Sequence, residues 1–183
     1  MTLHTHITAT RRRLAAALFC SLALSGLPAA HAAEPPATVT TLDLNRYLGT
    51  WYEIASYPQR FQRDCVATRA DYSLRPDSKL RVLNRCRKET LDGTWKEAEG
   101  RARVVAPGKL KVSFFWPFEG DYWVIALDPD YRWALVGGPG RDYLWILSRS
   151  PQMDDATYAA ITAKAVEQGF ALEPLRRTLQ GAD

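Results

Sequence analysis

Apolar and polar residues alternate at every second position in eight short segments that follow one another from Thr50 onward. This period of two is typical of β-strands that bury one face. Runs rich in Pro, Gly and Asp separate the segments, and such short turns join neighbouring antiparallel strands. A sheet of this length closes most simply into a barrel, because closure removes its exposed edges. The segments are 50–57, 66–74, 80–88, 94–105, 110–115, 122–127, 133–137 and 143–149.

The sequence therefore predicts an all-β fold, an eight-stranded antiparallel up-and-down β-barrel. One C-terminal α-helix is expected over about residues 154–168, because Asp154 is a good N-cap residue and Gly169 can end a helix. Its apolar stripe suits packing against the outside of the barrel. We assign residues 42–183 to the barrel domain and residues 33–41 to a flexible lead-in.

The N-terminal stretch has the features of a secretory signal peptide. Arg11–Arg13 precede an apolar run over Leu14–Leu27, and Ala30-His31-Ala32 offers small residues where a signal peptidase cleaves. The run is too short for a permanent membrane-spanning helix. Cys20 follows Phe19, whereas lipoprotein processing needs a small residue before the cysteine, so we expect no lipid anchor. The expectation is an exported protein released from its leader.

Cleavage after residue 32 changes the chemistry that the chain can perform. It leaves 151 of the 183 residues, which suits a single domain. It removes three of the 24 basic residues and none of the 20 acidic ones, so the net charge falls from +4 to +1. This charge gives no support to nucleic-acid binding. All three histidines are lost as well, which excludes Ser-His-Asp and Cys-His catalysis and His-ligated zinc.

Strand parity divides the residues into an inward and an outward set. The inward set mixes small residues, such as Ala98 and Gly100, with aromatic ones, so an eight-stranded barrel keeps room for one small apolar ligand. Trp145 is the firmest candidate for ligand contact, and the alternative is that it belongs to a plain barrel core. The predicted lining consists of Tyr72, Val82, Asn84, Val112, Phe114, Tyr122, Val124, Trp145 and Leu147.

Three motifs give residues 42–180 a resemblance to the lipocalin family. Gly49-Thr50-Trp51 opens the first strand, Asp128 and Tyr131 lie in "LDPDYRWALVGGP", and Arg149 ends the last strand in "DYLWILSRSP". Strand order places Trp51, Asp128 and Arg149 at one end of the barrel. We expect Gly49 to allow a tight turn there, and Arg149 to cover the Trp51 indole in a cation–π contact that closes this end. A ligand would then enter from the other rim.

The mature chain keeps two cysteines, Cys65 and Cys86. In an exported protein two cysteines suit one structural disulfide, and closing a loop of about 20 residues would stabilise the fold by about 3 kcal/mol. Their opposite strand parity requires a bulge or loop entry near Cys65. A redox-active pair is the alternative, although the spacing differs from C-x-x-C.

The resemblance implies a carrier of small hydrophobic ligands, such as fatty acids or lysophospholipids, that works in the bacterial envelope without a cofactor. The leader indicates a periplasmic location, and we expect peripheral contact with the outer membrane and a monomer or weak homodimer. Family members in bacteria are often lipid-anchored, and the leader of this chain departs from them. On the rim, Arg60, Phe61 and Arg63 either meet a lipid headgroup or form an ordinary solvated loop.

An enzyme acting on a bound lipid or isoprenoid is the alternative function. Glu53 shares the parity of Trp51, so it is a candidate acid inside the barrel, where burial raises the pKa of a carboxyl group. No second inward acid stands out near it, and "GGPGRD" (residues 137–142) joins two strands without a following helix to receive a phosphate. The sequence therefore favours a binding protein over an enzyme.

Overall fold

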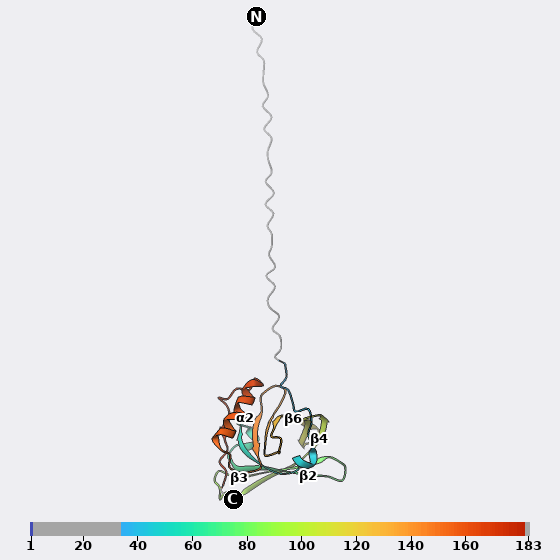
Figure 1. The fold of residues 1–183 in the computed structure, drawn as a ribbon, viewed down its shortest axis with the longest axis vertical. Helices are drawn as coiled ribbons and strands as arrows, with labels where there is room; N and C mark the ends of the chain where they lie inside the picture. Colours follow the sequence, from blue (N-terminus) through green and yellow to red (C-terminus); the bar gives the residue numbers. More distant parts are fainter. Residues whose placement is uncertain (2–33, 182–183) are drawn as a thin grey trace. The chain divides into compact units, whose positions relative to one another are not determined.

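A computed structural model describes Met1 and residues 34–181, so the predicted signal peptide lies outside the described residues apart from Met1. Eight antiparallel strands pair in chain order, and β1 pairs with both β8 and β2, which closes the barrel (Figure 1). The prediction of the fold class is confirmed. The strands are β1 Gly49–Ser56, β2 Cys65–Leu74, β3 Leu80–Lys88, β4 Trp95–Ala106, β5 Lys109–Phe115, β6 Phe118–Leu127, β7 Trp133–Gly137 and β8 Leu144–Ser148.

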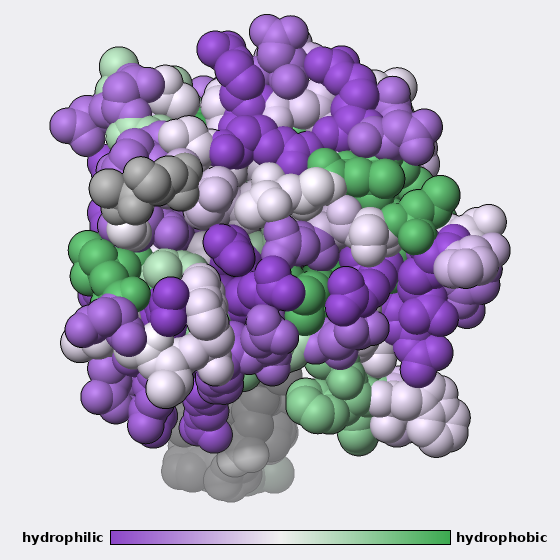
Figure 2. Space-filling model, turned by 90° about the horizontal axis from the view of Figure 1, so that it is seen from below, coloured by the Kyte–Doolittle hydropathy of each residue, from purple (hydrophilic) through white to green (hydrophobic). Residues whose placement is uncertain are grey.

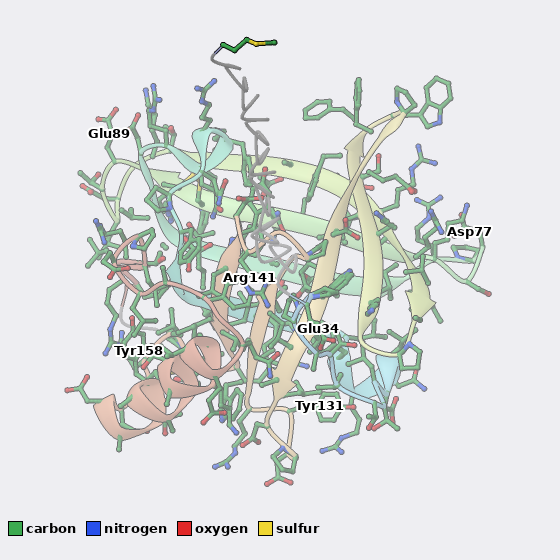
Figure 3. All side chains as sticks on the ribbon, turned by 90° about the horizontal axis from the view of Figure 1, so that it is seen from above. Glu34, Asp77, Glu89, Tyr131, Arg141 and Tyr158 are labelled. Atoms are coloured by element: carbon green, nitrogen blue, oxygen red, sulfur yellow. A yellow bond between two sulfur atoms is a disulfide. The ribbon has the colours of Figure 1, made fainter. Side chains whose placement is uncertain are left out.

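The helix α2, Asp155–Glu167, packs against the outside of the barrel as expected (Figure 3, where Tyr158 is labelled on it). Asp154 caps it, because its carboxylate accepts a hydrogen bond from the backbone N–H of Thr157 at 2.8 Å. Ile161 and Ala165 are fully buried in a hydrophobic cluster between the helix and the barrel wall. None of the helices in the described residues is both long and apolar enough to span a membrane.

The chain crosses the closed end of the barrel before it enters β1. A short helix, α1 Leu44–Tyr47, begins after Asp43, whose side chain accepts hydrogen bonds from the first turn. Ahead of it, residues 34–41 have no regular structure, and Val39 donates a backbone hydrogen bond to Val124 at 3.0 Å. Arg141 donates to the Glu34 carbonyl at 2.6 Å, and Figure 3 shows the two residues together.

The C-terminal segment completes the barrel where β1 and β2 separate. These two strands pair only from Gly49 to Tyr52, and the two-residue strand β9, Arg176–Arg177, then pairs with β1. Beyond it, Gln180 donates hydrogen bonds to the carbonyl oxygens of Glu53 and Thr68, at 2.7 and 2.8 Å. The alternating pattern gives no sign of this segment, because it is too short to show a period. The C-terminal segment bridges β1 and β2 near the open end.

A disulfide joins Cys65 on β2 to Cys86 on β3, with the two Cα atoms 5.4 Å apart. The register of β2 against β3 shifts between Val66 and Arg69, and Ala67 has a positive φ of 48°. This irregularity is the bulge that the parity of the two cysteines requires. Both the pairing and the bulge are confirmed.

Candidate functional site

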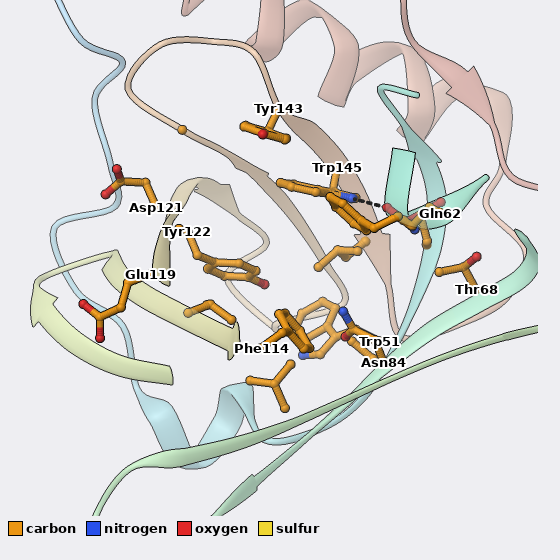
Figure 4. A pocket seen from close by; sticks show the side chains of 18 of the residues that line it. Trp51, Gln62, Thr68, Asn84, Phe114, Glu119, Asp121, Tyr122, Tyr143 and Trp145 are labelled. Atoms are coloured by element: carbon orange, nitrogen blue, oxygen red, sulfur yellow. Dashed lines mark hydrogen bonds between the residues drawn. The ribbon is translucent and has the colours of Figure 1, made fainter. Parts of the chain in front are cut away.

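The barrel encloses a cavity of about 620 Å³ that opens between the loops after β1, β5 and β7. Its wall is formed mainly by inward residues of the strands, and its lower end is the Trp51 side chain (Figure 4). Ligand sites in proteins commonly measure about 300–1,000 Å³, so the cavity has the size of a site for one small molecule. The opening between the three loops is called the mouth below.

The floor of the cavity is built by the predicted motif residues. The Arg149 guanidinium lies over the Trp51 ring at 3.8 Å, and its nitrogens donate to the carbonyl oxygens of Thr50 and Tyr131, at 2.8 and 3.3 Å. Trp51 is completely buried. Gly49 has a φ of +92°, which residues with a side chain rarely adopt, and an added Cβ would lie 3.4 Å from an Arg149 nitrogen. The floor is therefore closed.

Asp128 shapes the neighbouring turn between β6 and β7. Its carboxylate accepts hydrogen bonds from the Arg132 guanidinium, which lowers the pKa of Asp128 most, and from the backbone N–H groups of Arg132 and Asp130, which lower it further. The turn thereby holds Tyr131 in place, with its hydroxyl oxygen accepting a hydrogen bond from the Asp43 N–H at 2.9 Å. All the motif residues thus meet at the closed end.

Three tyrosine hydroxyls form a hydrogen-bonded chain above the floor. The Tyr122 oxygen lies 2.7 Å from that of Tyr47, and Tyr72 donates to Tyr122 at 3.0 Å. Burial raises the pKa of Tyr72 to about 12 and the pKa values of Tyr47 and Tyr122 well above the ordinary value. The phenols therefore stay neutral, and those of Tyr72 and Tyr122 add polar atoms but no charge to the cavity wall.

Eight of the nine predicted lining residues lie on the cavity wall. Val124 is the exception, because it packs in the filled part of the interior beside Val136 and is completely buried. Parity tells which face of a strand a residue occupies but not its depth along the barrel, and Val124 lies beyond Tyr122 toward the closed end. The residues on the wall are Tyr72, Val82, Asn84, Val112, Phe114, Tyr122, Trp145 and Leu147.

Glu53 faces inward and is 5% exposed, as parity suggested. Both of its carboxylate oxygens accept hydrogen bonds, one from Gln62 at 2.7 Å and the other from Thr178 at 2.6 Å and Ser56. Gln62 in turn accepts from the Trp145 indole N–H at 3.3 Å (Figure 4). Glu53 therefore ties the rim loop and the C-terminal segment to β1. Within residues 34–181, no group of three or more His, Cys, Asp or Glu is placed to hold a metal ion.

The mouth combines predicted and unforeseen residues. Phe61 lines it from the short helix η1, Arg60–Gln62, whereas Arg60 and Arg63 are exposed and lie off the cavity wall. The segment between the predicted strands 110–115 and 122–127 is more than a connecting turn, because Phe115 and Phe118 line the mouth from the β5–β6 hairpin. The signal was present in the run "FFWPF", because a solvated turn is normally polar. The loop after β7 adds Gly138, Pro139, Gly140, Asp142 and Tyr143.

Comparisons with known proteins agree with this architecture. The family model described as "Lipocalin-like domain" matches residues 42–180. "Outer membrane lipoprotein Blc" of Escherichia coli (strain K12) is 50% identical over 142 residues, covering 74% of this chain and 80% of that protein. "Temperature-induced lipocalin-1" of Arabidopsis thaliana is 45% identical over 159 residues, covering 78% and 81%.

A solved structure gives the same fold at lower sequence identity. Insecticyanin from the tobacco hornworm Manduca sexta superposes with a TM-score of 0.63 at 20% identity, covering 81% of this chain and 84% of that one. The family model, the two relatives and the motif residues at the closed end lead to one assignment. The chain belongs to the lipocalin family.

Proposed function

We propose that the protein binds and carries amphiphiles with one long apolar chain, such as fatty acids or lysophospholipids, in the bacterial cell envelope. The observation that carries this proposal is the cavity, which is closed below by Trp51 and open at the mouth. Membership of the lipocalin family supports the binding of hydrophobic ligands in general. That the ligand carries one long apolar chain goes beyond family membership and is our proposal.

The lining favours an apolar chain inside and a polar group at the mouth. Val82, Val112 and Leu147 offer aliphatic surface on the cavity wall, and Phe114 and Trp145 offer aromatic surface. Each methylene buried against such walls contributes about 0.8 kcal/mol to binding. Five charged residues line the cavity, and three of them, Glu119, Asp121 and Asp142, come from the strand and loop that form the mouth. The other two are Arg69 and Glu53, whose carboxylate oxygens are already hydrogen-bonded to Gln62 and Thr178. We therefore place the chain end of the ligand toward Trp51.

The envelope location rests on two observations. The leader has the features of a cleaved signal peptide, and the relatives from Escherichia coli and Vibrio cholerae are named outer membrane lipoproteins. Since Phe19 precedes Cys20, we propose that this chain is released into the periplasm and exchanges ligand with the outer membrane through peripheral contact. The proposed functional unit is a monomer or a weak homodimer.

We assign no catalytic step to Glu53. Its carboxylate oxygens are occupied by Gln62, Thr178 and Ser56, which gives it a structural role. The enzyme hypothesis has a direct check, which is turnover of a supplied lipid that disappears in Glu53→Gln. Under our proposal neither the wild type nor Glu53→Gln converts the lipid.

The test starts from protein secreted by its own leader and extracted with organic solvent. Mass spectrometry of the extract should identify single-chain amphiphiles, at up to one molecule per protein. Delipidated protein should then show quenching of tryptophan fluorescence on titration with a fatty acid or a lysophospholipid, because Trp51 and Trp145 line the cavity. An empty extract together with unchanged fluorescence would contradict the proposal.

A further inference from the structure

The tip of the β5–β6 hairpin carries the most exposed aromatic group among the described residues. We define the aromatic tip as Phe115, Trp116, Pro117 and Phe118, in which the three aromatic side chains are 78%, 85% and 76% exposed. On the face drawn in Figure 2, hydrophilic side chains predominate and hydrophobic ones form separate patches. A contiguous group of exposed apolar side chains marks a surface that contacts a protein, a membrane or a ligand.

The aromatic tip is continuous with the cavity. Phe115 and Phe118 belong both to the tip and to the mouth, and Phe61, which is 58% exposed, faces the mouth from the loop between β1 and β2. An apolar path therefore runs from the surface of the molecule into the barrel. A ligand that follows this path meets aromatic side chains before it reaches the strands.

The hairpin behind the tip is held by ion pairs. Arg103 on β4 contacts Glu119 on β6 at 2.6 Å, and Lys111 on β5 contacts Asp121 on β6 at 2.9 Å. These pairs compensate the two carboxylates nearest the tip, so no uncompensated negative charge follows Phe118 directly. Figure 3 shows aromatic side chains projecting from the free end of this hairpin.

The loop between β1 and β2, which shares the mouth with the tip, adds positive charge. Arg60 and Arg63 are exposed, and within residues 34–181 neither forms an ion pair. Lys96 donates a hydrogen bond to the Phe61 carbonyl at 3.0 Å, so a third cation lies beside the mouth. Basic side chains and an aromatic projection at one mouth fit a surface of phosphate-bearing headgroups.

We propose that the aromatic tip inserts into the headgroup region of a phospholipid membrane and holds the mouth against the bilayer. Aromatic rings, Trp above all, favour the membrane interface, because their apolar body and polar edge match its gradient. A second copy of the chain on the tip would cover the mouth, whereas a bilayer takes up the rings and also contains single-chain lipids. The inference rests on the proposed function only where it has the ligand pass from the bilayer into the barrel.

The test is sedimentation of the mature protein with vesicles of phosphatidylethanolamine and phosphatidylglycerol. Trp116→Ser removes the most exposed ring of the tip, and Trp116 is not part of the cavity wall. We expect its partition coefficient to fall roughly tenfold, the factor that corresponds to about 1.4 kcal/mol. The matched control is Leu74→Ser, which removes a 55% exposed side chain at the end of β2 far from the mouth and should partition like the wild type.

Ligand binding is measured in parallel without vesicles. Trp116→Ser should bind a fluorescent fatty acid as tightly as the wild type, while its uptake of the same probe from vesicles should slow. The inference is overturned if the wild type does not sediment with vesicles, or if Trp116→Ser sediments equally well. It is also overturned if the wild type forms a dimer that Trp116→Ser dissociates and neither protein binds vesicles. Failure of the wild type to bind the probe in solution would count against the proposed function instead.

Discussion

The Arg149 guanidinium carbon lies 3.8 Å from the centre of the Trp51 ring, and its outer nitrogens donate to the carbonyl oxygens of Thr50 and Arg46, at 2.8 and 2.6 Å. One side chain thereby joins α1, β1 and the segment after β8. Burial lowers the pKa of Arg149, because the charged guanidinium loses water contacts in this position. The indole face and the carbonyl oxygens take the place of that water.

This relationship predicts the effect of Arg149→Lys. An ammonium group keeps the charge but cannot stack on the indole and donate in several directions at once. We expect the free energy of unfolding to fall by about 2 kcal/mol, the scale of a desolvated cation–π contact and its hydrogen bonds. Urea unfolding followed by circular dichroism measures it. The control is Arg101→Lys at an exposed position on β4, and equal stability of both variants would contradict the account.

The disulfide between Cys65 and Cys86 predicts a redox-dependent stability. It joins residues 21 positions apart, and a loop of this length corresponds to about 3 kcal/mol of stabilisation in the chain-entropy model. We expect a reductant to lower the urea midpoint of the wild type toward that of the Cys65→Ser, Cys86→Ser double variant. The double variant itself should not respond to the reductant. A midpoint that reduction leaves unchanged would show that the bridge adds no stability.

The buried tyrosines predict a loss of stability at alkaline pH. Below pH about 10 the phenols are protonated in both the folded and the unfolded chain, so they cause no pH dependence. Above it the unfolded chain releases these protons, while the raised pKa values of Tyr47, Tyr72 and Tyr122 keep them bound in the fold. Each phenol then lowers stability by about 1.4 kcal/mol per pH unit.

The measurement for the tyrosines is the urea midpoint between about pH 9 and pH 11. Tyr122→Phe removes one of the three buried phenols, so its stability should decline less steeply with pH than that of the wild type. The slope is the informative quantity, because the variant also loses the hydrogen bonds to Tyr47 and Tyr72 and starts from a lower stability. Parallel slopes in the two proteins would contradict the assignment.

The alternating pattern predicted the barrel because burial of one face of each strand leaves a direct record in the sequence. The same record placed eight of the nine predicted lining residues on the cavity wall, including Trp145 and Tyr72. It misplaced Val124, since the period of two carries no information about depth along the barrel axis. Depth follows from strand tilt and from the floor that Trp51 and Arg149 build.

Two other features left no periodic record. The short strand β9 pairs with β1, and Gln180 bridges β1 and β2 through amide hydrogen bonds, which many sequences could supply. The aromatic tip left a signal in composition alone, the apolar run "FFWPF", and Pro117 and Gly120 otherwise give this segment the composition of a turn. The exposure of Phe115, Trp116 and Phe118 becomes evident only once the hairpin is built.

The central claim is that one apolar chain occupies the barrel cavity. Gly120 lines this cavity, and a Cβ added to it would meet only the Val112 carbonyl oxygen at 3.9 Å, so Gly120→Phe should fill the space without disturbing the strands. The control is Gly181→Phe outside the cavity wall, where the nearest atom to an added Cβ is a Leu91 methyl at 3.9 Å.

The deciding measurement is calorimetric titration of delipidated protein with a lysophospholipid below its micellar concentration. We predict one ligand per chain for the wild type and for Gly181→Phe, and an affinity at least about tenfold lower for a folded Gly120→Phe, a loss of about 1.4 kcal/mol. Binding by Gly120→Phe that equals the wild type in both affinity and stoichiometry would contradict the claim, because the ligand would then lie outside the barrel.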